Sequence, residues 1–208
     1  LTDGHPIGSD NVDAMAVNPL DPDQIFIAVE ARRSGSYVGT GLWRSDDGGG
    51  SWQSSGLEEV AIDGNGPWRF LGERLAFDPN GGAEVLFYGS LQDGLWRSSD
   101  RGLTWEQLNG LPSGIDGGVS FVLADPTSGT PEQASTRLYA GVCGEGLFRS
   151  EDGGTSWSLV PGGPPDSLYP VCAAISPEGD LYVGYGQALM SGQKAVYHLA
   201  PSGDSLSN

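Results

Sequence analysis

Short alternations of apolar and polar residues run through the chain and are interrupted every few positions by glycine, proline, asparagine or aspartate. Segments 12–17, 25–29, 85–89 and 119–124 are typical, because each is rich in β-branched and aromatic residues and is flanked by turn-forming residues. This pattern predicts short β-strands. Few long stretches lack both glycine and proline, so long helices are not expected. No apolar run is long enough to span a membrane as a helix.

The predicted strands come in pairs that are separated by an Asn-Pro, Asp-Pro or Ser-Pro turn. The turns lie at 18–19, 78–79, 125–126 and 176–177. A proline at such a place ends one strand and favours a turn before the next. The predicted pairs are 12–17 with 25–29, 74–77 with 85–89, 119–124 with 137–142, and 171–175 with 181–185.

A second motif, Ser-x-Asp-x-Gly-x-Ser/Thr-Trp, follows the first three pairs, and its tryptophans are 53 and 52 residues apart. An aspartate and a glycine in this arrangement predict a tight turn between two strands, with the tryptophan packed over it. Since the same acid recurs in every copy, we interpret the motif as a fold element rather than a catalytic or metal site. Its residues are Ser45, Asp47, Gly49 and Trp52, then Ser98, Asp100, Gly102 and Trp105, then Ser150, Asp152, Gly154 and Trp157.

A degenerate fourth copy closes the chain, with Gly203 in the glycine place and Leu206 in the tryptophan place. Four units of four antiparallel strands are typical of β-propeller blades. We therefore predict an all-β fold in which 1–208 is a partial propeller, with approximate blades at 10–58, 70–108, 117–160 and 168–208. We expect an open arc whose two apolar end faces are covered by remaining blades or by another protein.

Composition limits the partners. The chain has 27 acidic and 10 basic residues and a net charge of −17. Such a surface repels phosphate backbones and anionic lipids, so neither nucleic acid nor a membrane is an expected partner. The chain begins at Leu1 without a pattern of a secretion signal, so we expect a processed product or part of a longer protein. We expect no cofactor and no metal site.

Propeller geometry places the loops between blades, and those joining the second and third strands, on one face. Ligands usually bind on this face. The loops that we assign to it are 30–40, 60–72, 90–94, 107–118, 143–146, 159–170 and 186–194. Aromatic rings beside acids suit sugar binding, because pyranose C–H faces stack on rings while hydroxyl groups bond to carboxylates. The alternative is that Trp68 and Tyr169 only fill gaps between blades. The candidate substrate-binding residues are Trp68, Arg69, Tyr37, Asp116, Glu145 and Tyr169.

The motif copies are Asp-box (BNR) repeats. The sequence between the copies indicates a more specific family. Segment 72–80, Gly-Glu-Arg-Leu-Ala-Phe-Asp-Pro-Asn, resembles glycoside hydrolase family 74, as do 12–19, 85–89 and 179–183. The resemblance runs along essentially the whole chain. It implies part of a secreted, inverting xyloglucanase or endo-β-1,4-glucanase, with a β-glucan polysaccharide as partner.

The resemblance assigns no catalytic residue here, because the family's two catalytic aspartate segments are missing from this chain. Whether the chain is an enzyme therefore stays open. The alternative is a non-catalytic Asp-box propeller for recognition or assembly, of the sortilin or photosystem-assembly kind. A sialidase is a weaker option, since most arginines lie inside repeat motifs. A disulfide between Cys143 and Cys172, and two separate buried thiols, are both compatible with the sequence.

Overall fold

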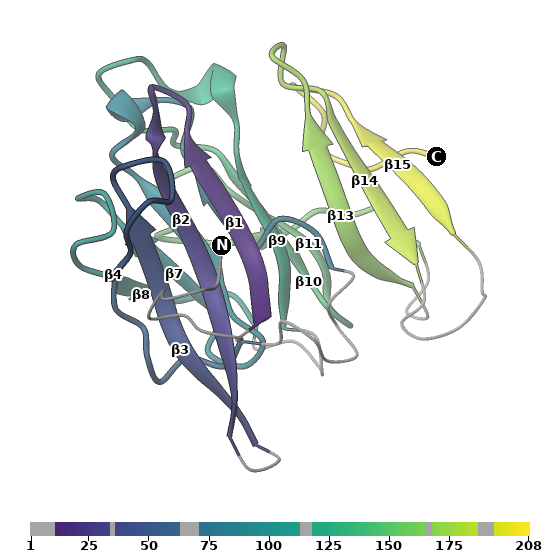
Figure 1. The fold of residues 1–208 in the computed structure, drawn as a ribbon. Helices are drawn as coiled ribbons and strands as arrows, with labels where there is room; N and C mark the ends of the chain where they lie inside the picture. Colours follow the sequence, from purple (N-terminus) through teal and green to yellow (C-terminus); the bar gives the residue numbers. More distant parts are fainter. Residues whose placement is uncertain (1–10, 34–35, 63–70, 113–117, 165–167, 187–193) are drawn as a thin grey trace.

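The computed structural model describes residues 11–33, 36–62, 71–112, 118–164, 168–186 and 194–208. These residues form four antiparallel sheets that follow one another along the chain (Figure 1). The first sheet is β1 (Asn11–Asn18), β2 (Asp21–Arg33), β3 (Ser36–Ser45) and β4 (Gln53–Ser54). The second is β5 (Leu75–Phe77), β6 (Leu86–Gly89), β7 (Leu95–Ser98) and β8 (Glu106–Leu108). The third is β9 (Val119–Ala124), β10 (Leu138–Val142), β11 (Gly146–Ser150) and β12 (Ser158–Leu159); the fourth is β13 (Tyr169–Ile175), β14 (Leu181–Gly186) and β15 (Ala195–Leu199).

Within each sheet the strands pair in chain order, so every connection is a hairpin. The period-two alternation sends neighbouring side chains to opposite faces. In the second sheet Leu75 lies opposite Tyr88, and Tyr88 lies opposite Trp96, so all three share one face. Phe87 pairs with Ala76 and belongs to the other face. Each sheet is therefore apolar on both sides, which suits a blade that packs between two neighbours.

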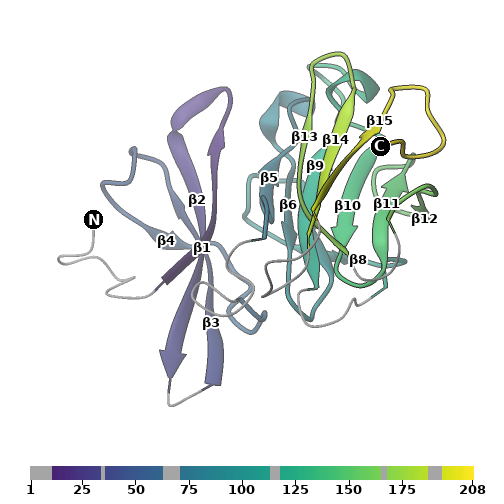
Figure 2. The same cartoon turned by 90° about the vertical axis from the view of Figure 1, so that its right-hand side faces the viewer.

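The sheets pack face to face around a central hollow of about 520 Å³, which residues from the innermost strands β1, β5, β9 and β13 line. Figure 2 shows these strands with β5, β9 and β13 side by side. The prolines of all four turns, Pro19, Pro79, Pro126 and Pro177, also line the hollow. Since these turns follow the innermost strands, they mark one end of the axis. The long β2–β3 hairpin extends in the opposite direction, at the bottom of Figure 1.

Each pair of neighbouring sheets shares a buried apolar core. Phe26 and Leu42 of the first sheet pack with Leu86 and Tyr88 of the second. Equivalent cores join the second sheet to the third and the third to the fourth. Fully burying a large apolar side chain contributes about 1.5–3 kcal/mol, so these junctions hold the sheets together.

The predicted all-β propeller fold is confirmed. The fourth sheet has three strands, and only an isolated bridge between His198 and Ser207 marks the place of a fourth. The fourth strands of the other sheets are short, at two or three residues. Helical structure in the described residues is limited to two 3-10 turns, Gly81–Ala83 and Pro126–Ser128.

Candidate functional site

The three complete Asp-boxes form nearly identical turns. In the first, the Ser45 hydroxyl donates to Asp47 Oδ1 (2.8 Å), and Ser45 Oγ accepts from the backbone N–H of Gly49 (2.8 Å). The backbone N–H and the hydroxyl of Ser51 donate to the two Asp47 carboxylate oxygens, both at 2.7 Å. Asp100 and Asp152 make the same bonds, with Thr104 and Ser156 as donors. Each carboxylate is therefore occupied by its own turn.

The box carboxylates are held in the ionised state by these bonds. Hydrogen bonds from Ser51, with a further one from Ser45, lower the pKa of Asp47 to about 2. The corresponding bonds from Ser156 and Ser150 lower the pKa of Asp152 to about 2. A general acid needs a raised pKa rather than a lowered one. The geometry thus suits a turn-stabilising role for these acids and not proton donation to a leaving group.

The three box tryptophans are partly buried. The Trp105 indole N–H crosses to the preceding sheet and donates to the Ser55 carbonyl (2.7 Å). The Trp157 indole N–H donates within its own turn, to the Gly154 carbonyl (3.1 Å). Trp52 packs against Ile27 and Val29 of its own sheet. The box turn lies at the outer edge of the blade, and this position leaves part of each ring exposed.

An arginine before each box connects one blade to the next. Arg97 Nη1 donates to the Gly153 carbonyl (2.7 Å) in the box of the third sheet. Arg149 Nη1 donates to the Gly203 carbonyl (2.8 Å) in the degenerate box of the fourth. His198 holds this position in the last blade, where it instead lies 2.7 Å from Asp180 and stacks on Tyr182. Arg97 and Arg149 therefore each bond to the backbone of the following blade.

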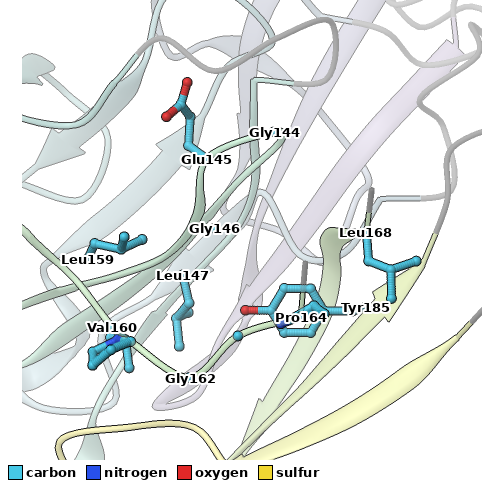
Figure 3. Close-up of a pocket in the computed structure, with 12 residues that line it drawn as sticks. Gly144, Glu145, Gly146, Leu147, Leu159, Val160, Gly162, Pro164, Leu168 and Tyr185 are labelled. Atoms are coloured by element: carbon cyan, nitrogen blue, oxygen red, sulfur yellow. The ribbon is translucent and has the colours of Figure 1, made fainter. Parts of the chain in front are cut away.

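A pocket of about 230 Å³ lies between the third and fourth sheets, among loops that the sequence assigned to the opposite, ligand-binding face (Figure 3). The turn after β10 and the segment between β12 and β13 form much of its wall, and the end of β14 contributes Tyr185. Burial raises the pKa of the Tyr185 phenol well above its ordinary value. The lining residues are Gly144, Glu145, Gly146, Leu147, Leu159, Val160, Pro161, Gly162, Gly163, Pro164, Leu168 and Tyr185.

The structure places three of the six candidate sugar-binding residues, and it does not bring them together. Glu145 is exposed in the turn after β10, and its carboxyl group points away from Tyr185 in Figure 3. Tyr169 is half-buried at the start of β13 and does not line the pocket. Tyr37 lies in β3 with its backbone opposite Arg32. Trp68, Arg69 and Asp116 lie outside the described residues.

A buried polar cluster between the first two sheets was not predicted. Arg74 and Asp13 are both almost fully buried, and Arg74 Nη1 lies 3.9 Å from Asp13 Oδ2. Burial and the nearby Asp13 charge raise the pKa of the buried Tyr88 phenol. Asp13 and Arg74 belong to different units, so the contact between them depends on how two blades pack. The sequence offered one clue, since Arg74 stands directly before an apolar strand.

Cys143 and Cys172 are not joined by a disulfide. Cys143 is buried at the end of β10, whereas Cys172 is exposed on the outward face of β13. The two side chains therefore lie in different environments, and the pairing that the sequence left open does not form in this structure.

Within the described ranges, no group of three or more His, Cys, Asp or Glu side chains is arranged to hold a metal ion. A search of the same ranges finds no helix with the length and apolar character that a membrane crossing requires.

Comparison with known proteins identifies relatives of this architecture. The BNR-Asp box repeat family matches residues 95–108, which contain the second box. A xyloglucanase from a Paenibacillus species is 35% identical over 195 residues, which cover 86% of this chain and 19% of the relative. The chain thus spans about a fifth of the length of the curated relatives it matches.

Solved structures give the same result. The glycoside hydrolase family 74 xyloglucanase from Xanthomonas campestris has a TM-score of 0.79 at 31% identity, over 95% of this chain and 30% of that one. The family 74 enzyme from Niastella koreensis has a TM-score of 0.83 at 27% identity, with the same coverage. The chain is an Asp-box propeller segment that resembles the xyloglucanases of this family.

Proposed function

We propose that this chain is the polysaccharide-binding propeller segment of a secreted glycoside hydrolase that acts on xyloglucan or a related β-1,4-glucan. The segment supplies binding surface on the loop face, and it contributes no catalytic pair of its own. The observation on which this depends is the similarity to xyloglucanases along more than four-fifths of the chain.

The distribution of acids supports a binding role rather than a catalytic one. An inverting glycosidase needs two carboxyl groups about 6.5–9.5 Å apart, one protonated and one free to activate water. The box acids are bonded within their turns, and Asp13 is paired with buried Arg74. Catalysis in the whole protein would then need carboxylates from segments beyond these 208 residues.

Two measurements on the purified chain test the proposal. A reducing-sugar assay with tamarind xyloglucan and barley β-glucan is expected to show no hydrolysis. Affinity electrophoresis in gels containing the same polymers is expected to show retardation by xyloglucan, because the loop face remains available. Cellulose should not be hydrolysed either.

Turnover that is abolished by Glu145→Gln or Asp116→Asn would contradict the proposal, because the segment would then hold its own active site. Loss of retardation in every polymer would contradict the binding role. If the chain neither hydrolyses nor binds the polysaccharides, the result would favour the recognition or assembly alternative.

A further inference from the structure

Three asparagines in the chain are followed directly by glycine: Asn65, Asn80 and Asn109. In such a pair the backbone nitrogen of the glycine can attack the side-chain carbonyl carbon of the asparagine, because glycine has no Cβ to hinder the approach. The structure describes the second and third pairs, whereas Asn65 lies outside the described residues. The two described pairs contain the same residue types in opposite environments, so any difference between their reactivities comes from the fold.

The first described pair, Asn80-Gly81, is held by hydrogen bonds to the third unit. Asn80 is only 9% exposed, and its amide nitrogen donates to the Pro126 carbonyl (3.1 Å) and to the Ser135 hydroxyl oxygen (2.9 Å). The backbone N–H of Gly81 donates to the Thr130 carbonyl (2.9 Å). The attacking nitrogen and the amide that would leave are therefore both engaged. A reaction between them requires these buried bonds to break first.

The second described pair, Asn109-Gly110, stands in the open. Both residues are exposed and follow directly after β8. In the part of the chain that the structure describes, no hydrogen bond engages the Asn109 side chain or the Gly110 backbone N–H. Water reaches both groups, and the side chain is free to turn toward the next backbone nitrogen.

We propose that Asn109 is a site of spontaneous deamidation to aspartate and isoaspartate, and that the fold protects Asn80 from the same reaction. This inference does not depend on the proposed function. Hydroxide takes the proton of the Gly110 N–H while the nitrogen bonds to Asn109 Cγ. The Cγ–Nδ2 bond breaks, and Nδ2 leaves as ammonia with a proton from water. Water then opens the resulting cyclic imide at either carbonyl, which gives aspartate or isoaspartate.

The position of Asn109 gives the modification a structural consequence. Isoaspartate carries the main chain through the former side chain and so inserts one methylene group between β8 and Leu111. Leu111 packs against the core that joins the second and third sheets. Gly110 lies beside the third box, since a Cβ added to it would lie 3.5 Å from Trp157 Cδ1. A longer backbone displaces these residues, so isoaspartate at 109 is expected to weaken this junction.

Peptide mapping of the purified chain tests the proposal. Trypsin cleaves after lysine and arginine, and it places the three pairs in separate peptides, 45–69, 75–97 and 102–137, each with a single asparagine. The chain is incubated at mildly alkaline pH in native buffer and, in parallel, in concentrated urea. Mass spectrometry measures the conversion of amide to acid, and retention time separates isoaspartate from aspartate. Asn109→Gln is the matched variant, because it keeps an exposed amide but would have to close a larger ring.

In native buffer, peptide 102–137 is expected to deamidate at least about tenfold faster than peptide 75–97, the equivalent of one to two hydrogen bonds that must break around Asn80. In urea the two rates should converge, because the bonds to Pro126, Ser135 and Thr130 are lost. Wild-type chain incubated in native buffer should melt at a lower temperature than fresh chain. Asn109→Gln should show no deamidation at 109 and should keep its melting temperature.

Equal rates for peptides 75–97 and 102–137 in native buffer would overturn the proposal, because the fold would then give Asn80 no protection. Reaction of Asn109 in urea alone would overturn it as well. If incubation lowered the melting temperature of Asn109→Gln as much as that of the wild type, the effect on the junction would be contradicted. All of these results leave the proposed function untouched, since none of them involves a polysaccharide.

Discussion

The interior blade faces and the two end faces of this molecule are built from the same repeat positions but have opposite exposure. Phe26, Phe87 and Tyr139 occupy one repeat position on the face that looks toward the following sheet, and each is at most 2% exposed. The residue at that position in the last sheet, Tyr182, is 48% exposed. A leucine position shows the same contrast, since Leu95 is fully buried and its counterpart Val196 is 62% exposed.

The opposite end repeats this contrast. Met15 and Val17 of β1 correspond to Leu75 and Phe77 of β5; Met15 is 62% exposed, whereas Leu75 is 2% exposed. Residue type alone therefore does not determine burial in this fold. Burial is determined by whether a neighbouring blade covers the residue. The two end faces have no such neighbour among the described residues, and they retain the apolar character of a blade interior.

The largest effect is expected for Trp105→Ala, which removes a ring packed across a junction and its bond to the Ser55 carbonyl. Because part of the Trp105 ring is exposed, we expect a cost of about 3 kcal/mol, the lower end of the range for buried aromatic side chains. Trp52→Ala, the matched change on the end face, should cost at most about half as much, because among the described residues Trp52 packs against its own sheet. Urea unfolding monitored by circular dichroism measures the free energy of unfolding of both variants. Equal decreases would contradict the claim that the neighbouring blade accounts for the larger effect at Trp105.

A second comparison uses the leucine position. Leu95→Ala should lower the free energy of unfolding by about 3 kcal/mol, as expected for a fully buried leucine. Val196→Ala should change it by less than about 0.5 kcal/mol, as for other exposed sites. Thermal and urea melts of the two variants provide the measurement. If Val196→Ala were as costly, the fourth sheet would be covered in solution.

The smallest effect concerns acid pH. The folded-state pKa values of Asp47 and Asp152 lie near 2, below their ordinary value of 3.8. Their contribution to stability is therefore present above pH 4 and is lost as the pH falls toward 2. Replacing both with asparagine should flatten the pH dependence of the unfolding free energy between pH 4 and 2. An unchanged slope would show that the turn bonds do not persist in solution.

Most of the fold could be predicted from the sequence because blade elements are local. The strand predicted at 119–124 matches β9, and those near 137–142 and 181–185 match β10 and β14 to within one residue. The box turns form within eight consecutive residues, so their bonds follow from sequence order. The largest difference is in β2, which runs from Asp21 to Arg33 where 25–29 was predicted. The outer strands β4, β8 and β12 are only two or three residues long.

The candidate site was harder to predict because it depends on contacts between units. The Arg74–Asp13 pair joins residues 61 positions apart, and neither residue forms a motif with the other. The pocket between the third and fourth sheets had a signal in the sequence, since Gly162-Gly163-Pro164 stands where the preceding unit has Gly110-Leu111-Pro112. The meaning of this difference appears only in the structure, where Leu111 packs against the core of its junction. Of the exposed aromatic and acidic residues on which the sequence argument relied, Glu145 lines this pocket, but its carboxyl group points away from Tyr185.

The most direct test of the account is a crystal structure of the chain bound to a xylose-branched glucan oligosaccharide. The account predicts that the oligosaccharide lies on the loop face, which includes the turn after β10 and the segment between β12 and β13. A ligand bound at the box turns, or on the exposed face of the fourth sheet around Tyr182, would contradict it.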